Sequence, residues 1–326
     1  MKRNFILFLS SFIIAFSAIL LGSYSYLKVN DKKIYNSVRK GEVKESKNEN
    51  KGGKKEKEEF NFHTLEEAVR HSKRINFLFL GMEEVRTDSL IFASFDPKNK
   101  KVDIISIPRD TYVHREGYDE AEERKINAVY GEHEIEGIKE TVSYILEGIP
   151  IHHYIMADYN SIAKIIDSIG GVEVNVPFHM RYYDFSAKPP VNIDIPEGKQ
   201  LLDGKKSVDF LRYRKGSDGK RGYADGDLGR IKAQQEFMKS FIDKVLSYKL
   251  ATVISTGIEL VETDINVGNG LLYGKDAIGI KKDSFTFTTL PGIADFKAIK
   301  GKTLSYFFYD EKAVKDLIGE IYEVKK

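Results

Sequence analysis

The residues most suited to chemistry lie between positions 210 and 235, where three arginines and a glutamine flank a glycine-rich loop. Arg212 and Arg214 occupy alternate positions, so in an extended chain their guanidinium groups share one side while Tyr213 points to the other. The planar guanidinium fork suits a phosphate group better than the ammonium of lysine does. The spacing therefore indicates a site for a phosphorylated ligand.

Arg230 and Gln234 extend this set onto the start of a predicted helix. Apolar residues recur at helical spacing from position 231 to 246, which places Arg230 and Gln234 one turn apart on one face. The free N–H groups of a helix N-terminus favour an anion at this point. The alternative is a solvated loop in which the arginines pair with neighbouring acids, and the segment alone favours neither interpretation. Those acids are Asp218, Asp225 and Asp227.

A second group of charged residues follows the ends of predicted strands. It consists of Glu83, Arg86, Asp88, Arg109 and Asp110. Strand ends in α/β sheets form ligand crevices, so these side chains are expected to converge at one edge. Carboxylates beside phosphate oxygens suit Mg²⁺, which takes one or two carboxylates together with phosphate and water. Charged residues also cap strands in many proteins, so the joint placement of the five is the evidence, and no single residue carries the interpretation.

The elements that must position these residues begin near residue 65. A short helix at 65–69 precedes a buried strand at 75–81, and strands at 89–95 and 102–107 are joined by residues with turn chemistry. This pattern predicts a β-hairpin. Helices and strands then alternate, which indicates the α/β class. The predicted helices are 135–146, 159–169, 205–211 and 311–322, and the predicted strands are 154–157, 172–176, 285–290 and 304–309.

The N-terminal region has a different composition from the rest of the chain. Residues 5–27 carry no charge and are long enough to span a bilayer, and Lys2 and Arg3 before them favour a cytoplasmic N-terminus. A cleaved signal peptide is the rival, but its apolar core is normally about 7–15 residues long. We therefore predict a cytoplasmic tail at 1–4 and an uncleaved anchor at 5–27. Residues 28–60, rich in Lys, Glu, Asn and Gly, form a solvated linker outside the membrane.

Composition excludes several classes of protein. With 326 residues and 41% hydrophobic content, the chain can build one large domain or two small ones. A net charge of +2 argues against a nucleic-acid partner held by bulk charge. The absence of cysteine excludes disulfides and cysteine-based sites. The seven histidines show no metal-binding spacing, and the sequence contains neither an ATP-binding phosphate loop nor a GxSxG nucleophile motif.

Seven segments in order resemble the LytR-CpsA-Psr family, over about residues 74–247 and again near 289–309. They are the strand and acidic turn ending in RTDS, DPKNKKVDIISIPRDTYV, KINAVYG, GIPIHHYI, IDSIGGVEVNVP, EGKQLLDGKKSVDFLRYR and DLGRIKAQQ. The resemblance implies one extracytoplasmic catalytic domain at 65–326, a three-layer α-β-α fold with a central mixed sheet and an apolar tunnel for a lipid tail. The membrane anchor and charged spacer match the topology of that family.

The resemblance also implies an activity. Members of the family are phosphotransferases that move a glycopolymer, such as teichoic acid or capsule, from a polyprenyl-pyrophosphate carrier to peptidoglycan. The implied cofactor is Mg²⁺, and the implied partners are the lipid-linked polymer, peptidoglycan and membrane lipid, with no nucleic acid. Phosphoryl transfer of this kind relies on positioning and on charge neutralisation by arginine and magnesium.

The matching motifs imply roles for individual residues. Asp227 and Arg230 are the catalytic candidates, with Asp227 deprotonating the incoming hydroxyl or orienting the cluster. Asp88 falls on the magnesium-binding carboxylate of the family. Glu83 departs from the family pattern, which has aspartate there, so its longer arm puts the metal geometry in doubt. The implied pyrophosphate ligands are Arg86, Arg109, Lys125, Arg212, Arg214, Arg230 and Gln234.

Two alternatives stay open from the sequence. One is a membrane-tethered protein that binds the polyprenyl pyrophosphate or the wall polymer without turning it over, for which the departure at Glu83 leaves room. The other is a hydrolase that passes the same phosphorus to water. A transcription regulator is the least supported function, because a cytoplasmic end of four residues cannot hold a DNA-binding domain.

Overall fold

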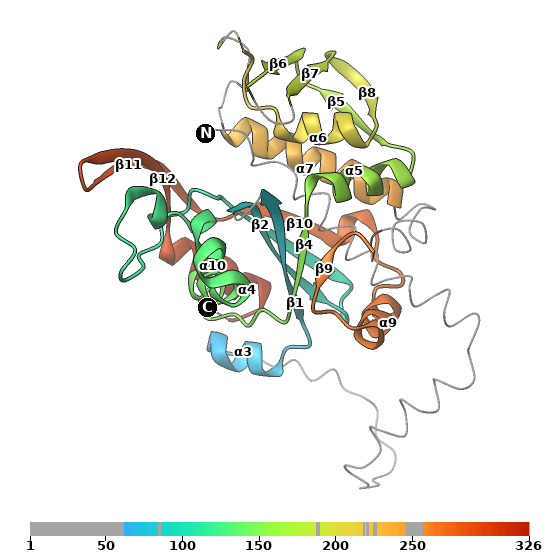
Figure 1. Ribbon diagram of the computed structural model, residues 1–326. Helices are drawn as coiled ribbons and strands as arrows, with labels where there is room; N and C mark the ends of the chain where they lie inside the picture. Colours follow the sequence, from blue (N-terminus) through green and yellow to red (C-terminus); the bar gives the residue numbers. More distant parts are fainter. Residues whose placement is uncertain are drawn as a thin grey trace, which may run out of the picture.

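The computed structural model describes residues 62–83, 86–186, 190–217, 219, 222–223, 227–245, 257 and 259–325 (Figure 1). Within those ranges, no helix is both long and apolar enough to cross a bilayer. The predicted anchor at 5–27 and the predicted linker at 28–60 lie outside the described residues.

A six-stranded mixed sheet lies at the centre of the domain, in the order β10-β3-β2-β1-β4-β9 (Figure 1). Strand β2 pairs antiparallel with both β1 and β3, whereas β4 is parallel to β1 and β10 is parallel to β3. The predicted hairpin and the predicted mixed sheet are confirmed. The strand bounds are β1 Ile75–Glu83, β2 Arg86–Asp96, β3 Lys101–Ile107, β4 His153–Ala157, β9 Glu262–Thr263 and β10 Phe285–Thr289.

The central strands are buried on both faces. Phe77 and Phe79 of β1 and Phe92 of β2 are completely inaccessible to solvent. Both faces therefore need a cover, which explains why these strands read as continuous apolar runs and do not alternate. The directions of pairing place the C-terminal ends of β1, β3, β4 and β10 and the start of β2 at one edge of the sheet.

Helices cover the sheet on its two sides. The helices α4 and α10 lie over one face in both views, and α9 lies on the other side in Figure 1. The ring of Tyr273 in α9 packs edge-on against the ring of Phe77, with ring centroids 5.9 Å apart. The helix bounds are α3 Leu65–His71, α4 Val129–Ile145, α5 Tyr159–Ser168, α6 Gly204–Arg212, α7 Asp227–Lys244, α9 Val267–Asp276 and α10 Glu311–Ile321, with short 3-10 helices η1 Ala121–Arg124, η2 Ile126–Ala128 and η4 Lys282–Ser284.

Three antiparallel strand pairs complete the described fold. The pair β5 Val172–Val176 and β8 Gly198–Leu202 and the pair β6 Met180–Asp184 and β7 Val191–Ile195 lie with α5, α6 and α7 beyond one end of the sheet (Figure 1). The hairpin of β11 Gly292–Ile299 and β12 Lys302–Tyr309 extends from the body. Its base is joined to the loop before η1, because Tyr112 packs on Phe308 with ring centroids 5.4 Å apart.

The first residue of α6, Gly204, sits against the backbone of α5 and has no room for a side chain. A Cβ at this position would lie 2.1 Å from the carbonyl oxygen of Ala163. The Gly204 amide also donates a 2.7 Å hydrogen bond to Oδ1 of Asp167. These contacts hold α6, and therefore the arginine segment that follows it, against α5.

We expect Gly204→Ala to destabilise the folded protein by about 1–3 kcal/mol, because overpacking forces α5 and α6 apart. Urea unfolding followed by circular dichroism measures the effect. Gly270→Ala in α9 is the matched control, since its new Cβ meets only Ile265 at 3.9 Å. If Gly204→Ala and the control both keep the wild-type urea midpoint, the close packing of α5 and α6 is contradicted.

Candidate functional site

The turn from β1 into β2 contains a β-bulge centred on Asp88. Gly81 pairs with Ser89, but the next residue, Met82, pairs with Thr87, so Asp88 is the extra residue on β2. A bulge bends the strand, redirects a side chain and commonly occurs beside an active site. The backbone thus sets Asp88 apart from its neighbours. The side chains of Asp88 and Glu83 lie outside the part of the chain that the structure describes.

Strand β4 and helix α5 connect this turn to the arginine segment. Gly81 pairs with Ala157, the last residue of β4, and α5 begins two residues later at Tyr159. The guanidinium carbon of Arg212 lies 4.9 Å from the centroid of the Tyr159 ring, a cation–π contact. Arg212 ends α6. Residues far apart in sequence therefore meet at one edge of the sheet.

Arg212 and Arg214 line a cavity of about 70 Å³. Tyr213 between them is almost fully buried, while both arginines are partly exposed, in agreement with the predicted alternation. The other lining residues are Tyr182, Val191, Ile193, Tyr213 and Lys215. This cavity places two guanidinium groups beside an apolar wall formed by the β6–β7 pair.

The predicted helix is present as α7, which begins at Asp227, and the side chain of Asp227 lies outside the described residues. Tyr223 packs against its first turn, where a Cβ on Gly229 would lie only 2.7 Å from the Tyr223 Cβ. Arg230 and Gln234 are 4% and 7% exposed. Burial raises the pKa of the Tyr223 hydroxyl, and the nearby charge of Arg230 acts in the opposite direction.

The hydroxyl of Tyr223 and Nε2 of Gln234 lie near this helix start and are buried without a hydrogen-bond partner among the described residues. Buried polar groups are normally satisfied, and an unmade bond costs about 1–3 kcal/mol. Both atoms can donate a hydrogen bond, so this pocket has the donor chemistry that suits an anionic oxygen.

The segment after β3 brings further predicted site residues to the same edge of the sheet. Nζ of Lys125 lies 2.8 Å from Oδ1 of Asp110 and 5.4 Å from the centroid of the Tyr306 ring. The Arg109 carbonyl accepts a 3.2 Å hydrogen bond from the amide of Asn127. The Lys125 ammonium is therefore already neutralised by a carboxylate, which the sequence did not reveal.

Arg86 is exposed at the first position of β2. A hydrogen bond from Lys302 lowers the pKa of Glu122, and the charge of Arg86 contributes in the same direction. Arg86 therefore lies near Glu122 of η1.

Four residues that sequence reasoning missed contribute to these surroundings: Tyr159, Tyr223, Thr87 and Asn127. Oγ1 of Thr87 and Oδ1 of Asn127 are buried without a partner among the described residues. Thr87 and Asn127 lie within the motifs RTDS and KINAVYG, so their positions were visible in the sequence. Their burial could be seen only once β2 and η2 were packed together.

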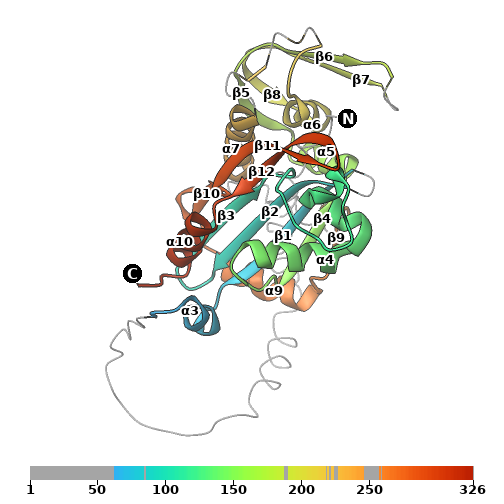
Figure 2. The same ribbon diagram turned by 90° about the vertical axis from the view of Figure 1, so that its left-hand side faces the viewer.

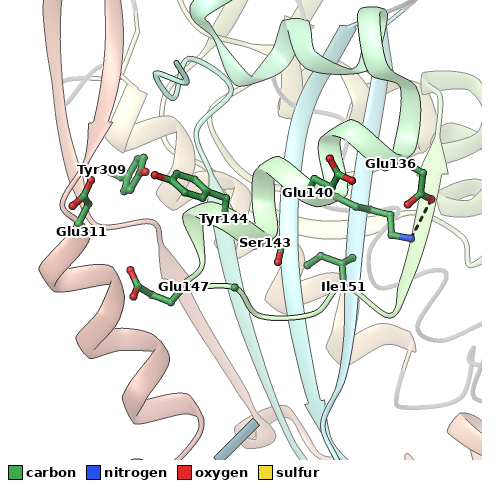
Figure 3. A pocket seen from close by; sticks show the side chains of 10 residues that line it. Glu136, Glu140, Ser143, Tyr144, Glu147, Ile151, Tyr309 and Glu311 are labelled. Atoms are coloured by element: carbon green, nitrogen blue, oxygen red, sulfur yellow. Dashed lines mark hydrogen bonds and ion pairs between the residues drawn. The ribbon is translucent and has the colours of Figure 1, made fainter. Parts of the chain in front are cut away.

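The structure also bears on metal and cavity predictions. Within the described ranges, no cluster of three His, Asp or Glu side chains could hold a metal ion. A cavity of about 700 Å³ lies elsewhere, between the outer face of α4 and the start of α10 (Figure 3). Its carboxylates, Glu136, Glu140, Glu147 and Glu311, would repel a phosphate, so this cavity is not the pyrophosphate site.

The described residues thus define a mixed α/β domain with a central mixed sheet, and the ends of β1, β3 and β4 and the start of β2 lie together at one end of that sheet. The chain belongs to the LytR_cpsA_psr family, whose model matches residues 34–322. The family predicted from the sequence motifs is confirmed.

Relatives with assigned activities support this placement. The polyisoprenyl-teichoic acid–peptidoglycan teichoic acid transferase TagV of Bacillus subtilis is 34% identical over 214 residues, which cover 61% of this chain and 52% of TagV. TagU of the same organism, with the same transferase name, is 25% identical over 278 residues, 79% of this chain and 80% of TagU. The match thus spans about half the length of curated TagV. The names agree with the predicted enzyme class.

The crystal structure of B. subtilis TagV is also similar to this chain. It matches with a TM-score of 0.63 and 27% identity, over 78% of this chain and 99% of the crystallised one. The single mixed α/β domain predicted from the sequence is therefore the fold of the family.

Proposed function

We propose that this protein is a membrane-anchored phosphotransferase that moves a glycopolymer from a polyprenyl-pyrophosphate carrier to peptidoglycan. The observation that carries the proposal is a pair of buried donors at the start of α7, Tyr223 and Gln234, which lie beside Arg230 and have no hydrogen-bond partner among the described residues. An anionic oxygen would satisfy both donors, and the arginines of the same edge suit a diphosphate. The transferase names of the relatives support the same reaction.

The reaction needs no external energy source, because it breaks the pyrophosphate linkage of the lipid carrier. A hydroxyl oxygen of peptidoglycan forms a bond to the phosphorus that carries the polymer, and the bond from that phosphorus to the bridging oxygen breaks. Polyprenyl phosphate leaves with the electron pair, and the hydroxyl proton passes to a base, for which Asp227 is the candidate. Arg230 and Gln234 hold the diphosphate and neutralise charge that develops on its oxygens. The other proposed ligands are Arg86, Arg109, Arg212 and Arg214, with Lys125 shared with Asp110.

Magnesium is part of the proposal. Asp88 would hold the ion, with Glu83 as a second carboxylate, and the bulge at Asp88 supports a position that departs from the regular strand. When bound, the ion would supply positive charge to the phosphate oxygens. The partly buried arginines supply the remaining positive charge.

The site of action is proposed from the sequence. Residues 5–27 would anchor the chain with its N-terminus in the cytoplasm, and the domain would act outside the membrane on a lipid carrier embedded in it. A substrate in the same bilayer as the anchor reaches the site by lateral diffusion.

The test uses the full chain in detergent micelles with a labelled polyprenyl-pyrophosphoryl saccharide and peptidoglycan oligomers, with magnesium or with a chelator. We expect label on the glycan with magnesium and its loss with the chelator. Release of labelled saccharide phosphate to water instead would identify a hydrolase. Tight lipid binding with no product would identify a carrier-binding protein, and either outcome contradicts the transferase.

A further inference from the structure

The β6–β7 strand pair presents two faces of different chemistry. Its inner face carries Tyr182, Val191 and Ile193, which line the cavity of Arg212 and Arg214. Side chains alternate along a strand, so the residues between these point outward. Figure 2 shows the pair extending beyond the rest of the domain. The wall of the arginine cavity is therefore also an outer surface of the protein.

Two aromatic rings form a platform on the outward side. Tyr183 and Phe185 lie two positions apart, with centroids 6.4 Å apart and planes inclined by only 10°. Their exposed fractions are 36% and 81%. The Phe185 ring, which is mostly exposed, contributes little burial energy to the free protein. Near-parallel exposed rings offer their negative faces to the polarised C–H groups of a sugar ring.

Polar groups flank the platform, and their charges largely cancel. Nε of Arg181 lies 3.6 Å from Oδ1 of Asp194 across the strand pair, and Nε2 of His179 lies 2.6 Å from the same oxygen. The hydrogen bond from His179 lowers the pKa of Asp194, so the carboxylate stays ionised. Asn192 is exposed beside Tyr183. Such donors and acceptors match sugar hydroxyls.

Hydrogen bonds join the platform to the arginine segment. Oγ of Ser217, three residues after Arg214, accepts a 2.7 Å hydrogen bond from the Tyr183 amide and donates one of 3.1 Å to the Tyr183 carbonyl. Because the arginine cavity and the rings lie on opposite sides of one strand pair, a sugar chain passing over the hairpin edge reaches both.

We propose that the Tyr183–Phe185 platform binds the glycan strand of the peptidoglycan acceptor and presents one of its hydroxyls to the arginine site. This inference rests on the proposed function, because it names the acceptor of that reaction. The charges of the described residues on the outer face largely cancel, and this favours the peptidoglycan strand over the transferred polymer as the saccharide bound there. A polyanionic polymer would require free cations, whereas Arg181 is paired with Asp194.

The test measures binding, so it does not require turnover. The full chain in detergent micelles is sedimented with peptidoglycan sacculi stripped of wall polymers, and separately incubated with purified soluble teichoic acid polymer. We expect the Tyr183→Ala/Phe185→Ala double variant to bind the sacculi about tenfold more weakly than wild type. The Tyr144→Ala/Phe296→Ala variant is the matched control, because those rings are 77% and 73% exposed elsewhere.

Each possible result either supports or overturns the proposal. Sacculus binding lost in the Tyr183→Ala/Phe185→Ala variant and kept in the control supports it, whether or not the protein transfers polymer. Equal binding by wild type and that variant overturns it. A selective loss of soluble polymer binding also overturns it, and assigns the platform to the donor. In a working transfer assay, the same variant should raise the KM for peptidoglycan oligomers.

Discussion

Replacing Arg230 by lysine should slow polymer transfer by about a hundredfold, and replacing it by alanine should slow it by about a thousandfold. Lysine keeps one positive charge but loses the planar fork that binds two phosphate oxygens at once. Alanine removes the charge and leaves Tyr223 and Gln234 as the remaining donors at the helix start. The measurement is the initial rate of label transfer from the lipid carrier to peptidoglycan oligomers.

A buried arginine can also matter for folding, so the two variants need a structural readout. Thermal unfolding by circular dichroism should show Arg230→Lys within a few degrees of wild type. Arg70→Lys is the matched control, because Arg70 lies exposed in α3 and pairs only with Glu66 among the described residues. If Arg230→Lys is folded and transfers at the wild-type rate, then bidentate phosphate contact by Arg230 is not part of the reaction.

The central sheet and its hairpin could be predicted because local and long-range signals agree there. Residues 96–100 have turn chemistry, and Oδ1 of Asp96 accepts hydrogen bonds from the amides of Lys98 and Asn99, which fixes the turn. The strands on either side are uniformly apolar because both their faces are covered. Sequence periodicity therefore sufficed for this part of the fold.

Other elements were incomplete or absent in the prediction for physical reasons. The helix predicted at 135–146 matches the part of α4 that follows Glu134, whose φ of 51° interrupts the helix; the turn of α4 before that break, which begins at Val129, was not predicted. Strand β11 is exposed on both faces, so it shows no alternation of polar and apolar residues from which a strand could be predicted. Its structure depends on pairing with β12.

The sequence predicted which residues belong to the candidate site but not which residues they contact. The motifs gave the arginines and Gln234, but nothing local links Arg212 to Tyr159 or Lys125 to Asp110. Those contacts depend on how β4, α5 and α6 pack. The bulge that distinguishes Asp88 likewise depends on the register between β1 and β2.

Asp88→Asn should lower polymer transfer at least about a hundredfold at every magnesium concentration. The amide keeps the size of the side chain but removes the negative charge that a magnesium ligand needs. An ion that binds only the folded protein raises its melting temperature, so we expect magnesium to stabilise the wild type and to have no effect on Asp88→Asn. Thermal unfolding with and without magnesium tests this separately from activity.

Variants of Glu83 test whether a second carboxylate binds the magnesium ion. Glu83→Gln should weaken the stabilisation by magnesium, whereas Glu83→Asp, which restores the residue usual in the family, should preserve it. Glu173→Gln is the control, since Glu173 lies exposed in β5 and pairs with Lys199 at 2.8 Å. If magnesium stabilises Asp88→Asn as strongly as the wild type, the ion binds elsewhere, and the bulge at Asp88 would then serve the geometry of the β1–β2 turn and not a metal site.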